Sequence, residues 1–187
     1  MTQTIAERID LTIAIHDRTW HSLGKEIRSY IRDVTLRTLT GFLTHLDLFR
    51  DHPEASIGVA IVLTHSEEIR ELNQRFRGID KATNVLSFPA DQDAPRLNAR
   101  ELILGDIIVA YEVVAREAEE QGKTIIAHLT HMLVHGLLHL IGHDHMDDAE
   151  AEQMEAYERK ILASFGIADP YATQNTSMNQ RVDPVHG

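Results

Sequence analysis

One stretch of the chain, residues 128–145, reads HLTHMLVHGLLHLIGHDH and holds six of the 12 histidines. His135 and His139 are four residues apart, so on a helix their imidazoles project from one face, one turn apart. Gly142 then lets the chain leave the helix, because glycine adopts left-handed backbone conformations without steric cost. The turn is expected to bring His145 back towards the same point. The pattern H-x-x-x-H-x-x-G-x-x-H therefore predicts three ligands for one metal ion.

The predicted ligand set points to zinc in a catalytic role. Three protein ligands leave the fourth position of a tetrahedral zinc ion to water, whereas structural sites are closed by four protein ligands. Such an ion polarises a phosphoryl oxygen or lowers the pKa of its water to about 7. We therefore predict one Zn²⁺ ion bound by His135, His139, His145 and water.

Other histidines of the same stretch offer competing ligand sets. His131 lies four residues before His135, so these two also form a pair on one helical face. His128 lies on roughly the same face, and we interpret His131 as a packing residue or as a support for the ligands. His143 competes with His145, but it falls on the other side of the glycine turn.

The ligand spacing resembles that of metallopeptidases but lacks their general base. In the pattern H-E-x-x-H, the glutamate after the first histidine is the base for peptide hydrolysis. That position is Gly136 here. The sequence therefore favours a metal site that does not cut peptides.

Composition restricts the class of protein. A chain of 187 residues with 43% hydrophobic and 25% charged residues is ordinary for one globular domain. The absence of cysteine excludes disulfides and cysteine-ligated zinc. We find no segment with the roughly 20 apolar residues that span a bilayer, so we expect a cytoplasmic protein without membrane contact.

The net charge of −11 argues mildly against a nucleic-acid partner, which normally requires a basic surface. Much of the acid is local, however. Residues 147–158 contain six carboxylates and no basic residue, namely Asp147, Asp148, Glu150, Glu152, Glu155 and Glu158. We interpret them as the solvated face of one helix, so the net charge says little about the field at the metal site.

Hydrophobic periodicity predicts the elements that position these residues. Alternating patterns predict strands at residues 10–16, 55–63, 84–88 and 102–110, and helical patterns predict helices at about 23–49, 64–78, 112–120, 124–141 and 148–165. A capping box of Thr64 and Glu67 is expected to open the second helix. We expect an α+β fold with helices packed on a mixed sheet of about four strands, and a zincin-like metal-binding helix. Residues 1–168 would form one domain, and residues 169–187 a disordered tail.

A second stretch with chemical potential is residues 76–89, FRGIDKATNVLSFP. It joins a predicted helix end to a short strand. Arg77 offers a planar fork for a phosphate, and Lys81 adds a point charge, so both are candidate substrate-binding residues. Arg77 could equally bind the carboxyl end of its own helix.

These two stretches together resemble the YbeY family of bacterial endoribonucleases. HMLVHGLLHLIGHDH is similar to the family motif H-G-x-L-H-L-x-G-Y-D-H, and FRGIDKATNVLSFP to the block R-G-x-D-x-x-T-N-V-L-S-F-P. The segment LGDI at residues 104–107 matches a third element, and the resemblance runs in order from about residue 55 to residue 166. His143 stands where the family has tyrosine.

The resemblance implies a function and a set of roles. His135, His139 and His145 would be the metal ligands, and Arg77 the arginine essential for activity. The family cleaves single-stranded RNA in a metal-dependent reaction, processes the 3′ end of 16S rRNA and acts in ribosome quality control. Its partners are pre-ribosomal particles, a small-subunit ribosomal protein and an assembly GTPase.

Several points stay open at the level of sequence. Arg77 would stabilise charge that grows on phosphoryl oxygens, but neither the nucleophile nor a general base is evident. Asp144 is a candidate base, or it orients a ligand imidazole. Two rival functions are a metallopeptidase-like hydrolase and a non-enzymatic ribosome-assembly factor whose metal only stabilises the fold.

Overall fold

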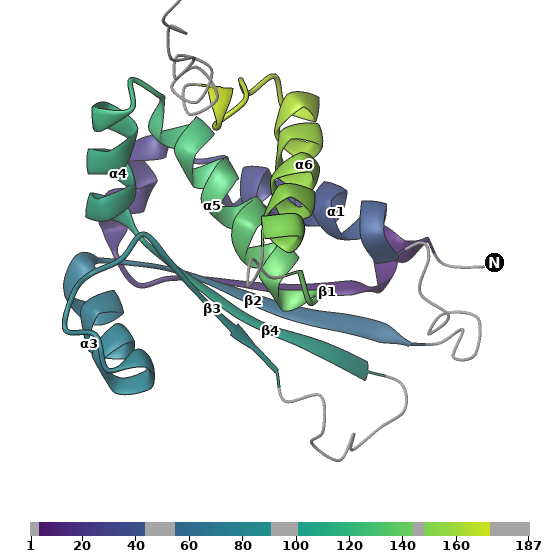
Figure 1. The fold of residues 1–187 in the computed structure, drawn as a ribbon. Coiled ribbons are helices and arrows are strands. Elements are labelled where there is room, and N and C mark those ends of the chain that lie inside the picture. Colours follow the sequence, from purple (N-terminus) through teal and green to yellow (C-terminus); the bar gives the residue numbers. More distant parts are fainter. Residues whose placement is uncertain (1–3, 44–54, 91–100, 144–147, 173–187) are drawn as a thin grey trace, which may run out of the picture.

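A computed structural model describes residues 4–43, 55–90, 101–143 and 148–172 of the chain, and the following account concerns these residues (Figure 1). Within them the chain forms the strands β1 (Ile9–Ile15), β2 (Ser56–Thr64), β3 (Val85–Pro89) and β4 (Glu101–Ala110). The helices are α1 (Ile27–Leu43), α3 (Ser66–Arg77), α4 (Tyr111–Glu120), α5 (Ile125–Leu140) and α6 (Asp148–Ser164). Two short 3₁₀ helices, η1 (Ile5–Arg8) and η2 (Arg18–Leu23), flank β1.

The four strands form one mixed sheet in the order β1-β2-β4-β3. Strands β1, β2 and β4 are parallel, and β3 pairs antiparallel with β4 at the edge of the sheet. This confirms the predicted α+β fold with a four-stranded mixed sheet.

Strand β4 contains an irregularity that brings the edge strand close. The register between β2 and β4 shifts after Gly58, which pairs with Ile103, so that Val59 pairs with Gly105. Gly105 has a φ of +133°, and a Cβ atom there would lie 2.1 Å from the carbonyl oxygen of Phe88. Only glycine permits this approach of β3 to β4.

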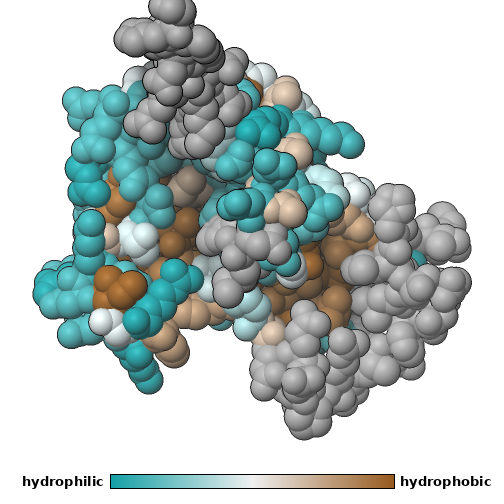
Figure 2. All heavy atoms as spheres, viewed as in Figure 1, coloured by the Kyte–Doolittle hydropathy of each residue, from teal (hydrophilic) through white to brown (hydrophobic). Residues whose placement is uncertain are grey.

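The two faces of the sheet pack against different helices, as the alternation of side chains in a strand requires. Ile107 and Val109 of β4 face the main core below α1 and α5, whereas Ile108 packs with Ile69 of α3 in a smaller cluster. Figure 1 accordingly shows α1, α4, α5 and α6 on one side of the sheet and α3 on the other. The outer surfaces of these helices are largely hydrophilic, while apolar atoms appear between them (Figure 2).

One sequence prediction needs correction. Thr64 does not cap α3, because it is the last residue of β2 and pairs with Ala110. The N-cap is His65, whose side chain accepts a hydrogen bond from the Glu68 amide at 3.3 Å. The described residues include the first four of the expected tail, residues 169–172, and Asp169 accepts a hydrogen bond from Arg159. The remainder of the expected tail, residues 173–187, lies outside the described residues.

Among the described residues, no helix combines the length and the apolar character needed to cross a bilayer.

Candidate metal centre

Helix α5 carries the first four histidines of the stretch, from His128 to His139. Its first turn is capped by Thr124, whose hydroxyl accepts a hydrogen bond from the Ala127 amide at 3.1 Å. Its last turn ends before Gly142, which has the left-handed φ of +92° predicted for the exit from the helix. Ten of its 16 residues are buried, because the helix packs on β3 and β4 and is flanked by α1, α4 and α6.

His135 and His139 come together on α5 as their spacing predicts. Their Nε2 atoms are 3.1 Å apart, and their ring centroids are 4.6 Å apart. Two imidazole nitrogens that each lie 2.0–2.1 Å from one tetrahedral zinc ion are separated by roughly 3.3 Å. The donor atoms of this pair therefore fit a shared metal ion.

A buried carboxylate orients the first histidine of the pair. Glu158 of α6 is 1% exposed, and its Oε1 atom lies 2.8 Å from Nδ1 of His135. The carboxylate takes the Nδ1–H hydrogen bond, so that the lone pair of a neutral His135 is on Nε2, which faces His139. This is the tautomer that ligation through Nε2 needs.

Glu158 was missed at the level of sequence, where it was assigned to a solvated acidic face. That interpretation is wrong for this residue, although Glu152 on the same helix is exposed. A usable signal was present, since Glu158 lies midway between Met154 and Leu162 at intervals of four. All three are buried on one stripe of α6.

The second oxygen of Glu158 holds two further groups in place. Its Oε2 atom lies 3.1 Å from Nε2 of His131 and also accepts a hydrogen bond from the Tyr171 hydroxyl. Burial raises the pKa of Glu158, but the hydrogen bonds from His131, His135 and Tyr171 outweigh it and bring this pKa to about 2. Burial raises the pKa of Tyr171, and the neighbouring Glu158 carboxylate raises it further. Glu158 is therefore an anion and Tyr171 a neutral donor.

His128 and His131 act as supports rather than as members of the pair. Nε2 of His128 lies 2.7 Å from Glu117, and Nε2 of His131 points to Glu158. His143 packs its ring against Phe42 and Tyr157, with centroid separations of 5.3 and 4.9 Å. Burial lowers its pKa. The contact of His131 agrees with its interpretation as a packing or supporting residue, and His128 and His143 are likewise engaged by neighbouring side chains.

Two residues of the predicted site lie outside the described residues, namely the expected third ligand His145 and the candidate base Asp144. Accordingly, no group of three histidine or carboxylate side chains suited to a metal ion occurs within the described part of the chain.

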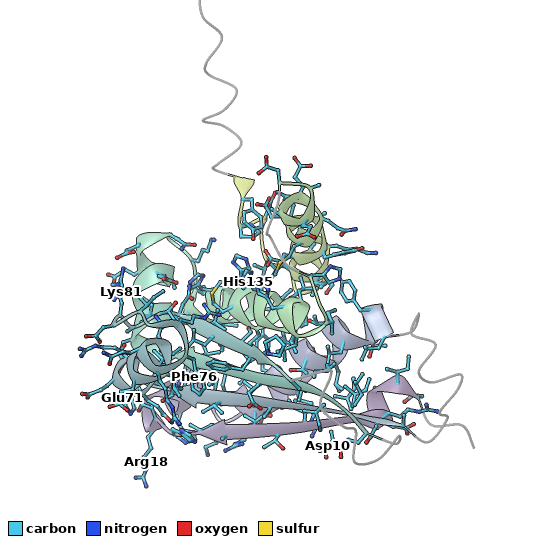
Figure 3. All side chains as sticks on the ribbon, turned by 60° about the horizontal axis from the view of Figure 1, so that its bottom comes forward. Asp10, Arg18, Glu71, Phe76, Lys81 and His135 are labelled. Atoms are coloured by element: carbon cyan, nitrogen blue, oxygen red, sulfur yellow. The ribbon has the colours of Figure 1, made fainter. Side chains whose placement is uncertain are left out.

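Arg77 and Lys81 lie at the end of α3 and in the loop that follows it. Both are exposed, and neither side chain has a hydrogen bond or ion pair within the described residues. The backbone amides of Gly78 and Ile79 bond the last carbonyls of α3, so Arg77 does not serve as the cap of its own helix. No described contact joins Arg77 or Lys81 to the histidine pair. Figure 3 shows Lys81 at the α3 end of the molecule and His135 on α5 near α6.

Gly136, at the position of the peptidase glutamate, is tightly packed against the sheet. A Cβ atom at this buried position would lie 3.0 Å from the Ser87 hydroxyl and 3.1 Å from a methyl carbon of Ile107. A side chain here would require the Ser87 and Ile107 side chains to shift. The position that carries the peptidase base is thus filled by helix–sheet packing.

Comparisons with known proteins agree with the sequence motifs. The profile of the family described as "Endoribonuclease YbeY" matches residues 20–166. A protein of that name from Paramagnetospirillum magneticum is 49% identical over 126 residues, which cover 66% of this chain and 77% of the relative. Another from Rhodopseudomonas palustris is 49% identical over 147 residues, covering 76% and 73% respectively. A solution structure of a Thermotoga maritima protein shares the fold, with a TM-score of 0.52 at 22% identity, covering 95% of this chain and 100% of its own.

Proposed function

The chain belongs to the YbeY family of endoribonucleases, and on that premise we propose that it is a zinc-dependent enzyme that cleaves single-stranded RNA during ribosomal RNA processing. The observation that carries the zinc requirement is the pair of Nε2 atoms of His135 and His139, which are 3.1 Å apart. The 3′ end of 16S rRNA is the proposed processing target. A role in ribosome quality control follows from the same family resemblance.

His135, His139 and His145 would hold the ion in a zincin-like arrangement. When bound, zinc supplies a Lewis acid for a phosphoryl oxygen and activates water. The chain itself supplies the orientation. Glu158 keeps the proton of His135 on Nδ1, and its burial prevents water from competing for this hydrogen bond.

Arg77 would act on the substrate rather than on the metal. Its guanidinium is exposed and has no partner within the described residues, so it is available to a phosphodiester. A planar guanidinium binds two phosphoryl oxygens at once and stabilises the charge that grows on them during cleavage. Lys81, four residues later, would hold a neighbouring phosphate as a point charge.

The setting proposed for this activity is the cytoplasm, without membrane contact. The partners proposed are single-stranded rRNA within pre-ribosomal particles, a small-subunit ribosomal protein and an assembly GTPase.

A metallopeptidase activity is disfavoured by one specific observation. A Cβ atom at Gly136 would already be in tight contact with the Ser87 and Ile107 side chains, and this packing disfavours a glutamate base at that position. A non-enzymatic assembly factor would need the metal for stability but would not need Arg77.

The test is cleavage of a single-stranded rRNA fragment by the purified protein, with the same fragment in a duplex and a peptide library as controls. We expect cleavage of the single strand alone, loss of cleavage after chelation and recovery with zinc. Peptide hydrolysis, or RNA cleavage that survives complete removal of metal, would overturn the proposal.

A further inference from the structure

A large cavity lies beside the metal centre and is separated from it by a few side chains. The cavity has a volume of about 650 Å³, within the range of ligand-binding pockets. It is bounded by the end of α4, the first turns of α5 and the segment after α6, which returns beside the start of α5 (Figure 1). A smaller cavity of about 230 Å³ is lined by His135, Glu158 and Tyr171.

The two cavities share a wall. Tyr171 lines both of them, and His131 lines the larger one while its Nε2 atom lies 3.1 Å from Glu158 of the smaller one. If one part of a ligand occupied the smaller cavity next to His135, the neighbouring part could therefore occupy the larger cavity.

The walls of the larger cavity combine flat and apolar groups with a polar rim. His128, His131 and Tyr171 offer flat rings, and Met132 offers a thioether. The rim carries the carboxylates of Glu117 and Glu120 and the ammonium of Lys123. Two carboxylates against one ammonium disfavour a phosphate. Flat walls with a hydrogen-bonding edge are the features that proteins use to hold an unstacked base of single-stranded RNA.

Hydrogen bonds hold one carboxylate oxygen of Glu117, and the other oxygen has none within the described residues. Its Oε2 atom accepts hydrogen bonds from Asn84 at 2.9 Å and from Nε2 of His128 at 2.7 Å. His128 is 3% exposed, so this pair is rigidly packed. The other oxygen, Oε1, has no hydrogen bond within the described residues. A fixed, unused acceptor in a cavity wall selects for an N–H donor on the ligand.

We propose that this cavity binds one nucleobase of the RNA substrate, next to the phosphate that is cleaved. The proposal rests on the function proposed above. Bases that present amino donors would be preferred. Guanine would bind most tightly, because its N1–H and amino group suit the carboxylates while its O6 atom suits Lys123. Uracil, whose single N–H lies between two carbonyl groups, would bind most weakly.

The test uses neighbouring exposed glutamates of α4 as a matched pair. Glu120 lines the cavity, whereas Glu119 is exposed and does not. Glu120→Trp should fill the mouth of the cavity, and Glu119→Trp controls for a tryptophan on the same helical turn. The probe is a short fluorescein-labelled, 2′-O-methylated single-stranded RNA. Its binding to the zinc-loaded protein is measured by fluorescence anisotropy, and a gel verifies that it stays intact.

An abasic site is then placed at each position of the probe in turn. With the wild type and with Glu119→Trp, one position should weaken binding by about tenfold or more when its base is removed. Guanine at that position should bind better than uracil. With Glu120→Trp, the intact probe should bind as weakly as the abasic one, and base identity there should no longer matter.

The outcomes separate this inference from the proposed function. The base site is overturned if the wild type shows no sensitive position, or if Glu120→Trp leaves the sensitivity unchanged. Either result counts even if unmodified RNA is cleaved. A sensitive position that disappears in Glu120→Trp, in a protein that fails to cleave RNA, supports the base site and overturns the catalytic proposal.

Discussion

The histidine pair on α5 and the basic residues after α3 differ in how far their side chains are already engaged. His135 has its Nδ1 atom 2.8 Å from a carboxylate that is 1% exposed, and that carboxylate is held by two further donors. Arg77 and Lys81 are exposed and have no such partners within the described residues. Under the proposed roles, the difference teaches that metal ligands are fixed in advance by their hydrogen bonds, whereas side chains that bind a mobile polyanion stay solvated until it arrives.

The largest effect is expected from removing a member of the pair. His135→Ala removes one of two converging Nε2 atoms, so the protein should lose bound zinc and RNA cleavage together. Metal analysis by mass spectrometry, run beside a cleavage assay, measures both. Cleavage at the wild-type rate in this variant would contradict the role given to His135.

Arg77→Ala should separate cleavage from metal binding. Without the guanidinium, the cleavage rate should fall on the order of 10²–10³-fold, as when a donor to a developing oxyanion is removed. Zinc content and melting temperature should not change, because the exposed Arg77 side chain makes no hydrogen bond or ion pair within the described residues. The matched control is Arg75→Ala, since Arg75 is also exposed on the last turn of α3 but packs over Phe76. An equal loss in both variants would indicate general charge rather than a specific role.

Glu158→Gln tests whether the orientation of His135 matters. The amide no longer matches both the imidazole and the phenol donors, so zinc affinity should fall by about 10–100-fold. Competition with a chromophoric chelator measures this affinity. Glu152→Gln on the exposed face of the same helix should have no effect. Unchanged affinity in the Glu158 variant would show that its buried contacts serve the fold alone.

The smallest effect concerns His128 and the stability of the metal-free protein. Burial lowers the pKa of His128, and the opposing attraction of Glu117 is weaker, while His131 and Lys123 lower it further. As the pH falls below about 6.5, His128 therefore takes up a proton more readily in the unfolded chain than in the folded one. The folded state loses stability in that pH range.

Urea unfolding at several pH values measures this contribution. His128→Gln should flatten the slope of stability against pH below about 6.5, by at most about 1.4 kcal/mol per pH unit. An unchanged slope would mean that His128 takes up its proton as readily in the folded as in the unfolded chain, which would contradict the lowered pKa of this buried residue.

The sequence predicted what depends on local spacing. The interval of four between His135 and His139, the glycine that ends α5 and the alternation within the strands are all local signals, and the structure confirms them. The order of the strands depends on tertiary pairing and could not be derived in this way. Strand β4 lies between β2 and β3, although β3 precedes it in the chain.

The supporting contacts were missed because they join distant parts of the chain. Glu158 belongs to an acidic run whose other members include exposed residues, and Tyr171 belongs to a polar segment assigned to a disordered tail. Their roles follow only from tertiary packing, because α6 must lie beside α5 to bring the Glu158 carboxylate to His135 and His131. The one local indication that Glu158 is buried was its place on the same stripe of α6 as the apolar Met154 and Leu162.

X-ray absorption at the zinc edge of the zinc-loaded protein tests most directly whether the histidine pair shares one metal ion. We expect one zinc per chain with imidazole nitrogens at about 2.0–2.1 Å, and one fewer imidazole when zinc is retained in His139→Ala. A zinc environment without imidazole, or one that His139→Ala leaves unchanged, would contradict this account.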